Sequence, residues 1–435
     1  MYVPSIRHNF RVMVEPHPVQ LVVQDDLERR RLTVFFRLLL VIPHVVWVVV
    51  WGVAAVLAAV GSWIATLVTG QPPAGLHGFL SRYVRYLVHV SAYLWLVADP
   101  YPGFAGREGT YPVDVRLPGP SPQSRWKTFL RIVLAIPAFM VSAALGSGSG
   151  ISASSSNGKN RASTSGNLAL AGVCGVLGWF ASLVRGRMPK GLRDAGAYSV
   201  GYDAHVLAYL LLVTDRYPNA DPTAMLTDVA RPPQHPVYLV GDAHDLRHSR
   251  VLVFFRLPLA IPHIVWLALW TIAAFVVAIV DWFATLVRGT PPQALQRFLS
   301  RYVRYTLHVS AFITLAANPF PGFAGQEGLY PLDVVLPGPQ RQNRWVTAFR
   351  IVLAIPALLV NSALGAALFV SAFLTWFVAL GTGSAPWGLR NLSAYALRYG
   401  AQLNAYLYLL TERYPHASPL EGADDKDSSF DDLTA

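Results

Sequence analysis

One motif occurs four times in the chain and limits what it can fold into. An arginine stands six residues before a proline inside an apolar run: "FRLLLVIP" from residue 36, "LRIVLAIP" from 130, "FRLPLAIP" from 255 and "FRIVLAIP" from 349. The prolines are 94 residues apart within each half (137 − 43 and 356 − 262), and the two halves are offset by 219 residues (262 − 43). The chain is therefore a duplication of a duplication, and its fold must be built from four related modules.

Each copy of the motif belongs to the same series of segments. A short segment with β-branched residues at period two precedes it, as in "HPVQLVV" from 17 and "YPVDVRLP" from 111, which predicts a strand. An apolar stretch follows and ends in a tryptophan, a residue that favours membrane interfaces. From Pro43 to Trp63 is 20 residues (63 − 43), and a helix of that length rises about 30 Å, the thickness of a bilayer core. Each apolar stretch therefore predicts a membrane span.

A second helix is predicted to return across the membrane in every module. It follows a Gly/Pro-rich turn such as "VTGQPPAGL" from 68 and ends where Pro and Asp accumulate, as in "ADPYPGF" from 98. Two spans per module place all four strands on the same side of the membrane. The sequence thus predicts an all-α polytopic membrane protein with about eight transmembrane helices from four two-span modules, and short β-strands that form a small extramembrane cap.

The second module contains extra residues within its apolar stretch. Residues 146–167 form a Gly/Ser-rich insertion, whose backbone cannot face lipid because its amide groups would lack hydrogen-bond partners there. We expect the span to start near Leu168, and the segment from Trp126 to Leu145 to be an interfacial or re-entrant helix. The acidic segment 417–435 is expected to be a disordered tail. The predicted modules are 1–110, 111–222, 223–329 and 330–416.

The composition supports a membrane protein and narrows the classes of function. Of the 435 residues, 53% are hydrophobic and 14% are charged, against about 25% charged in soluble domains. The net charge is +11, but the arginines stand at the ends of apolar segments, which fits anionic headgroups and argues against nucleic acid as a partner. The single Cys174 excludes an internal disulfide and a metal site built from several thiolates.

The basic residues also predict an orientation. The N-terminal segment lacks a charged region followed by an apolar one, so no cleavable signal peptide is expected. Counting Lys and Arg alone, we expect a multi-pass protein of the bacterial plasma membrane, with the strand side and both termini in the cytoplasm.

The repeated arginines are the first candidate site. One interpretation is that they snorkel to headgroups from a helix that enters the interface obliquely. The other is that they form a ring that gathers anionic lipid headgroups or an anionic partner. These candidates are Arg37, Arg131, Arg256 and Arg350.

A polar stripe on the returning helices is the second candidate site. Its residues recur at three- and four-residue spacing and therefore share one face of each helix. They either hydrogen-bond between helices and fix their packing, or form a proton, anion or quinone site within the membrane. The stripe comprises Arg82, Arg85, His89, Tyr93, His205, Tyr209, Arg301, Arg304, His308, Arg398 and Gln402.

Other chemistry finds less support in the sequence. No cofactor is expected; b-type haem would need His44 with His89 and His263 with His308 as paired ligands, yet the members of each pair are expected at different depths. Asp281, directly before Trp282, is expected to be an acid at an interfacial helix end. No nucleophile elbow, P-loop, dinucleotide fingerprint or HExxH motif occurs, so no catalysis is expected.

The motifs together resemble a family of bacterial, largely actinobacterial, membrane proteins known as domain of unknown function four-three-eight-nine. The matching segments are "RLLLVIPH", "WIATLVTG", "RYVRY" and "AYLWLVADPYP", and the resemblance covers nearly the whole chain between residues 17 and 416. It implies a membrane protein with tandem copies of a two-span module, and it implies no activity. Tyr198 and Tyr395 replace the first stripe arginine and depart from the pattern, which argues against a strict four-fold site.

The role that these observations favour is non-enzymatic. We expect a structural or accessory subunit that organises a membrane complex or anionic lipids. The alternative is a transporter or channel for a small anion or lipid-like solute, through a path lined by Arg, His and Tyr. The expected partners are membrane lipids, anionic ones in particular, and other proteins of a membrane complex.

Overall fold

The computed structural model describes residues 17–146, 169–226, 229–241, 247–420 and 422. Helices dominate, and each of the four modules contains an apolar helical segment followed by a more polar helix of 21 residues. The elements are β1 (Gln20–Val23), α1 (Arg31–Thr69), α2 (Ala74–Leu94), β2 (Val113–Arg116), α3 (Arg125–Phe129), α4 (Arg131–Leu145), α5 (Leu170–Arg185), α6 (Lys190–Leu210), α7 (Pro222–Met225), β3 (Tyr238–Gly241), α8 (Arg250–Phe254), α9 (Arg256–Arg288), α10 (Gln293–Ile313), β4 (Leu332–Val335), α11 (Arg344–Ala348), α12 (Arg350–Thr382) and α13 (Trp387–Leu407).

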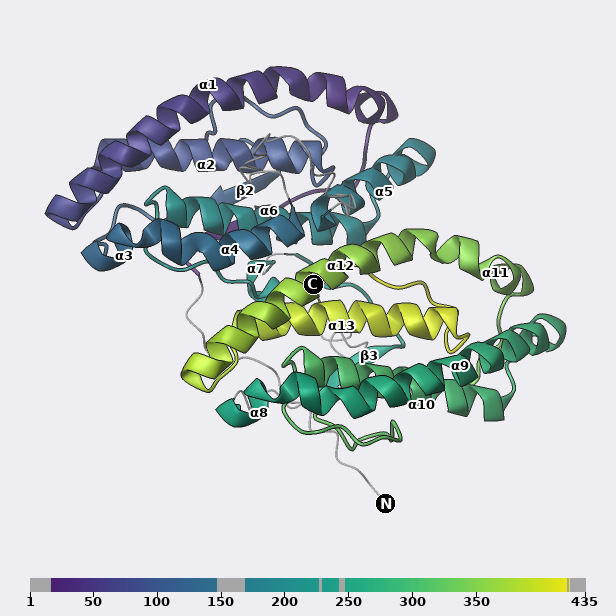
Figure 1. The fold of residues 1–435 in the computed structure, drawn as a ribbon. Coiled ribbons are helices and arrows are strands. Elements are labelled where there is room, and N and C mark those ends of the chain that lie inside the picture. The colour runs from purple at the N-terminus through teal and green to yellow at the C-terminus, as the bar shows by residue number, and fades with distance from the viewer. Residues whose placement is uncertain (1–16, 147–168, 227–228, 242–246, 421, 423–435) are drawn as a thin grey trace, which may run out of the picture.

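The elements form three layers. The polar helices α2, α6, α13 and α10 make the middle layer, in which α2 contacts α6, α13 contacts α10, and Tyr198 of α6 meets Tyr395 of α13 edge-to-face. The apolar helices α1, α4 with α5, α12 and α9 each pack on the polar helix of their own module and run across the molecule beside one another (Figure 1). Each strand packs on a polar helix. The polar helices therefore lie between the apolar layer and the strands.

The apolar helices turn their polar side chains inward and their apolar side chains outward. Along α1 the buried residues include Arg37, His44 and Ser62, whereas Leu38 and Leu57 are about 70% exposed (71% and 69%). This is the reverse of a helix on the surface of a water-soluble protein. It is the pattern expected where the surrounding medium is lipid, so the apolar helices are compatible with membrane insertion.

Eight transmembrane helices are not confirmed. Among the described residues three helices, α1, α9 and α12, are long and apolar enough to cross a membrane, while α4 and α5 are shorter apolar helices. The returning helices α2, α6, α10 and α13 fall outside this group, although their length of 21 residues is sufficient. The prediction of eight spans relied on the length of these helices. Their charged and polar side chains, however, bind partners inside the protein.

The strands pair within each half of the chain. β1 and β2 are antiparallel, with Gln20 opposite Arg116, and β3 and β4 repeat this arrangement with Tyr238 opposite Val335. The result is two separate two-stranded sheets. The expected short strands are therefore present, but they form two sheets rather than one cap, and each sheet joins two neighbouring modules.

The extra residues of the second module interrupt what is one helix in the fourth. α4 and α5 correspond to the two parts of the continuous α12, and a Cβ on Gly146, at the end of α4, would lie 2.1 Å from the Cβ of Ala169 before α5. The two apolar pieces thus meet end to end rather than forming a separate re-entrant helix and a span. Apart from Gly146, the predicted insertion 146–167 lies outside the described residues, as does most of the predicted tail 417–435.

The tryptophans near the ends of the apolar helices join modules in pairs. The indole Nε1–H of Trp63 in α1 donates to the Thr128 carbonyl of the second module over 2.9 Å, and that of Trp179 in α5 donates back to Val34 of α1 over 2.9 Å. Trp282 and Trp376 make the same reciprocal bonds in the other half. These residues were expected at a lipid interface, but their N–H groups serve contacts between modules.

Candidate functional site

The four repeated arginines bind the ends of the returning helices. Arg37 of α1 donates through Nη1 to the carbonyl oxygens of Tyr93 and Ala98, the latter over 3.0 Å, and its Nη2 lies 2.7 Å from Asp99 Oδ1. Tyr93 belongs to the last turn of α2. The corresponding carbonyl acceptors are Tyr209 and Thr214 for Arg131, and Tyr406 and Thr411 for Arg350. Arg256 differs, because it donates to the carbonyls of Ala317 and Asn318, which follow the end of α10.

This arrangement satisfies groups that a helix cannot satisfy alone. The last carbonyls of a helix lack intrahelical donors and carry the negative end of the helix dipole, so a buried cation is favourable there. After α2 the chain turns at Leu96, whose φ of 60° lies in the left-handed region that glycine usually occupies at this position. Leu212, Leu315 and Leu409 do the same in the other modules, with φ of 59°, 58° and 57°.

The arginines also stack on aromatic rings inside the protein. The Cζ atom of Arg37 lies 4.3 Å from the ring centroid of Tyr93, and Arg131 lies 4.6 Å from that of Tyr209. All four arginines are at most 2% exposed. The snorkelling interpretation therefore does not hold, because the guanidinium groups turn inward to helix ends that only the folded chain brings near them. Contact with anionic headgroups stays a prediction, and this burial does not favour it.

His44 and His263 occupy equivalent aromatic sites. Nδ1 of His44 lies 2.8 Å from the hydroxyl of Tyr86, and its ring stacks on Phe104 with 4.4 Å between centroids. Trp47 donates to the Phe104 carbonyl over 3.0 Å and holds that loop against α1. His263 repeats the contacts with Tyr305 and Phe323. These histidines thus fix the loop after the returning helix onto the apolar helix.

The stripe of the first module is gathered by one carboxylate that the sequence analysis did not single out. Asp114 of β2 lies 3.1 Å from Nε of Arg85 and 3.2 Å from Nε2 of His89, and it accepts the Gly109 N–H over 2.7 Å. Burial alone would raise the pKa of Asp114, but the hydrogen bonds from His89 and from backbone N–H groups outweigh it, so the pKa lies below its ordinary value. Asp114 is therefore a charged anchor between β2 and α2.

The third module contains the same network. Asp333 of β4 lies 3.1 Å from Nε of Arg304 and 3.0 Å from Nε2 of His308, and its pKa is lowered in the same way. His89 and His308 are thus bound to carboxylates, whereas His44 and His263 are bound to tyrosines. The arrangement does not bring either pair together on a common ligand.

In the second and fourth modules the stripe anchors the other strands. His205 lies with Nε2 2.8 Å from the Val19 carbonyl, beside the start of β1. Gln402 donates to the Val237 carbonyl over 3.0 Å, beside the start of β3, and Arg398 donates to the Ser418 carbonyl over 2.6 Å. Two other members of the stripe, Tyr93 and Tyr209, provide the aromatic rings on which Arg37 and Arg131 stack. Most of the stripe therefore holds strands and helix ends in place.

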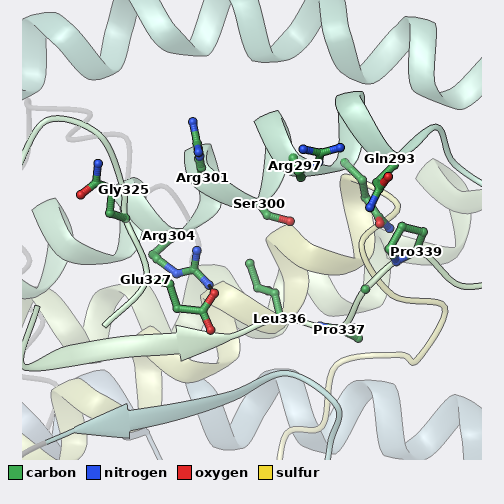
Figure 2. A pocket seen from close by; sticks show the side chains of 13 residues that line it. Gln293, Arg297, Ser300, Arg301, Arg304, Gly325, Glu327, Leu336, Pro337 and Pro339 are labelled. Carbon is green, nitrogen blue, oxygen red and sulfur yellow. Dashed lines mark ion pairs between the residues drawn. The ribbon is translucent and has the colours of Figure 1, made fainter. Parts of the chain in front are cut away.

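Arg82 and Arg301 are the exposed members of the stripe. Arg301 lines a cavity of about 410 Å³ between α10 and the segment after β4, together with Arg297, Arg304, Ser300 and Glu327 (Figure 2). Nη2 of Arg304 lies 3.1 Å from Oε2 of Glu327. The cavity thus holds three guanidinium groups and one carboxylate at its lining. Gly78 occupies the position of Arg297 in the first module (297 − 219).

Asp281 was expected to be an acid at an interfacial helix end, but the structure places it elsewhere. It is fully buried on the inner face of α9, within electrostatic reach of Arg350 of α12. The structure turns it inward because the outward face of α9 is apolar. Within the described part of the chain, no three His, Cys, Asp or Glu side chains gather in a way that could hold a metal ion.

The sequence contains a signal for Asp114 and Asp333 but none for the leucine turns. An aspartate stands in the middle of both "YPVDVRLP" and "YPLDVVLP", and a charged residue within a short apolar strand indicates a bound partner. Leu96 and its three equivalents are ordinary leucines in sequence, so their left-handed backbone is visible only in the fold.

Fold and contacts together define a four-module helical repeat protein whose apolar helices are compatible with membrane insertion. The chain belongs to the family described as Domain of unknown function (DUF4389), whose sequence model matches residues 31–105, 167–220, 250–324 and 344–418. Comparisons with curated proteins and with solved structures found no match. Family membership supports the repeat architecture and assigns no activity.

Proposed function

We propose that this protein is a membrane-bound structural or accessory subunit that organises a membrane complex and performs no catalysis of its own. One observation carries the proposal: the repeated polar residues bind one another and the backbone inside the protein, while large apolar side chains cover the outer face of α1, α9 and α12. A chain that devotes its repeated arginines and histidines to its own helix ends and strands is suited to a scaffold.

The predicted module boundaries fit this role. Each of the segments 1–110, 111–222, 223–329 and 330–416 contains one polar helix and one apolar helical segment, which is divided in the second. Placement in a bacterial plasma membrane, with the strands on the cytoplasmic side, is part of the proposal and rests on the distribution of Lys and Arg.

Transport through a polar path receives less support from the geometry. Such a path would need Arg85, His89, Arg304 and His308 to be free to meet a solute. Each of them instead lies within 3.2 Å of Asp114 or Asp333. Moving an anion past them would require breaking two buried ion-pair networks, each of which also holds a strand.

The accessory role is tested by gentle-detergent purification of the full chain with a tag at its C-terminus, followed by identification of bound proteins and lipids. We expect the same protein partners or lipids after cross-linking in intact membranes as after purification. The Arg350→Met variant, in which the end of α13 is loosened, should lose these partners or lipids. The Arg107→Gln variant, altered on the exposed loop, should retain these partners or lipids. A homogeneous chain with neither partner nor lipid, in both preparations, would contradict the proposal.

Binding of a small anion is a second candidate function, and the cavity at Arg297, Arg301 and Arg304 favours it. Guanidinium groups bind oxyanions through paired N–H donors. Titration with inorganic phosphate by calorimetry should give a heat of binding that Arg297→Gly, which recreates the first-module residue, reduces. Arg82→Gln, on the equivalent helix of the first module, is the control. Equal binding by wild type and Arg297→Gly would contradict this candidate.

A further inference from the structure

The apolar surface of the long helices exceeds the thickness of a membrane. α1 has 39 residues, and its exposed apolar side chains extend from Leu32 (73%) to Val68 (70%). A helix of that size is about 58 Å long, whereas the bilayer core is about 30 Å thick. To fit its apolar length into the core, α1 would have to tilt by about 60°, beyond the usual range of about 0–40°. Length therefore argues against an upright span.

Exposed arginines lie level with the middle of these helices. Thr271, near the middle of α9, has its hydroxyl 2.9 Å from that of Tyr302, and the neighbouring Arg301 is exposed beside the open cavity. In the first module a Cβ on Gly52, in the middle part of α1, would lie 3.0 Å from the hydroxyl of Tyr83, whose neighbour Arg82 is exposed. If α1 and α9 crossed the bilayer upright, both arginines would face hydrocarbon near its centre, at a cost of several kcal/mol each.

The apolar side chains belong to one layer of the molecule. α1, α5, α4 and α12 follow one another through direct contacts, and α9 continues the row through α11 and α8 (Figure 1). The polar helices lie behind this row. The strands pack on these polar helices, and the arginine cavity is lined by residues of one of them, α10. The molecule thus has an apolar side formed by long helices and a polar side formed by strands and charged residues.

Exposed basic residues stand at both ends of the apolar helices. Arg31 lies at the start of α1, and Arg125 donates to the Val68 carbonyl at its other end over 2.9 Å. Arg250 precedes α9, and Arg288 lies in its last turn. In a membrane protein with a fixed orientation, a spanning helix would have an excess of basic residues at one end only. Basic residues at both ends indicate that both ends meet anionic headgroups.

Exposed tryptophans accompany these ends. Trp126 of α3 is 76% exposed, next to Arg125 at the end of α1, and Trp345 of α11 is 75% exposed, next to Arg344 at the end of α9. Tryptophan prefers the headgroup level of a membrane, where its ring is apolar and its N–H is solvated. The two residues mark a headgroup level at the helix ends.

We infer that the protein lies flat on one leaflet of an anionic membrane, with α1, α4, α5, α9 and α12 parallel to the membrane plane and their outer faces in the hydrocarbon region. Helices in this position bury their apolar face by about 5–10 Å and place basic residues at the headgroups. The strands and the arginine cavity then face water on the same side of the membrane as both ends of every apolar helix. This inference rests on the proposed membrane-bound role and specifies how the membrane is bound.

Labelling of single cysteines tests the inference directly. In a Cys174→Ala background, Ser249→Cys and Thr290→Cys mark the two ends of the α8–α9 segment, and Ser300→Cys marks the cavity beside the neighbouring helix α10. A membrane-impermeant maleimide is applied to sealed right-side-out and inverted vesicles from the expressing cells. A flat protein labels at all three positions in the same vesicle type. Labelling of detergent-solubilised samples gives the total labelling of each cysteine. Labelling of the wild-type chain, whose Cys174 is buried, gives the background labelling.

The outcomes separate two failures. Labelling of Ser249→Cys and Thr290→Cys in opposite vesicle types, with Ser300→Cys protected, would overturn the flat arrangement and leave membrane binding intact. A chain that stays in the soluble fraction would overturn the proposed membrane-bound role itself.

A lipid-binding measurement tests the headgroup contacts independently. Flotation with phosphatidylcholine vesicles, with and without phosphatidylglycerol, should show binding that the anionic lipid strengthens and that salt weakens. Arg185→Gln with Arg288→Gln removes two basic residues from helix ends and should weaken binding to the anionic vesicles by about fivefold per arginine. Arg107→Gln with Arg116→Gln removes the same charge from the strand side and should leave binding unchanged. Equal losses in the two variants would contradict the inference.

Discussion

Arg37 contacts Tyr93 in two ways at once: its Nη1 donates to the Tyr93 carbonyl oxygen, and its guanidinium carbon lies 4.3 Å from the centroid of the Tyr93 ring. The contact joins the start of an apolar helix to the end of the polar helix of the same module. Arg131 with Tyr209 and Arg350 with Tyr406 repeat it, and Arg256 stacks on Phe312 in the third module. The stacking of the arginine on an aromatic ring at the end of the polar helix is common to all four modules, and it explains why the motif contains an arginine each time.

Loss of this arginine should destabilise the protein strongly. Arg37→Met removes the arginine donor from the Tyr93 and Ala98 carbonyls and leaves Asp99 without its cation. We expect a loss of about 3 kcal/mol in the free energy of unfolding, read as a lower thermal midpoint in mild detergent. Arg301→Met, which removes an exposed arginine, should change it by about 0.5 kcal/mol or less. Similar shifts of the thermal midpoint in the two variants would show that the buried contact does not stabilise the protein more than an exposed arginine does.

At the leucines with a left-handed backbone, a glycine variant should be more stable than an alanine variant, which reverses the usual order of stability. Leu409, with φ of 57°, is 1% exposed, so both substitutions remove its buried side chain. Alanine keeps the unfavourable backbone conformation, whereas glycine relieves it by about 1 kcal/mol. Leu409→Gly should therefore be more stable than Leu409→Ala in thermal unfolding. At Leu403, which is buried within α13, the order should be the ordinary one, with alanine favoured by about 1 kcal/mol. The same order at both positions would refute this explanation.

His416 should make stability depend on pH. Burial, followed by the nearby charges of Arg398 and His235, lowers the pKa of His416 to about 4, from its ordinary value of about 6.5. The unfolded chain takes up this proton first, so the stabilising contribution is complete above about pH 6.5 and is lost as the pH falls towards about 4. His416→Asn retains an acceptor for the Ser418 N–H. Its thermal midpoint should fall less than that of the wild type between pH 7 and pH 5, and identical slopes would contradict the prediction.

The repeat and the helix periodicity could be predicted from the sequence, but the contacts of the repeated residues could not. The spacing of Arg37 and Pro43, repeated four times, indicates four modules, and the stripe at Arg85 and His89 indicates one helical face. The acceptors of Arg37 lie 56 and 61 residues away in sequence, so only the packing of α1 on α2 reveals them. The same holds for Asp114, which reaches Arg85 and His89 through the packing of β2 on α2.

The eight predicted spans are not confirmed, for a related physical reason. Helices α2 and α10 have the length of a span, and their apolar residues contribute to the hydrophobic clusters in the protein interior. Their polar residues, such as Arg304 and His308 in α10, pair with strands instead of facing a channel. Composition alone does not distinguish a polar helix that lines a pore from one that supports a neighbouring sheet.

Vesicle flotation of a chain altered on its outer apolar face tests the central claim most directly. Leu269 and Phe275 of α9 are 57% and 66% exposed, and Leu269→Glu with Phe275→Glu places two charges on that face without touching the buried contacts. We predict that this variant keeps the helical circular dichroism of the wild type and no longer floats with lipid vesicles, because each charge opposes burial in hydrocarbon by about 2.5–3.5 kcal/mol. Flotation equal to that of the wild type would contradict a membrane contact through the outer faces of the apolar helices.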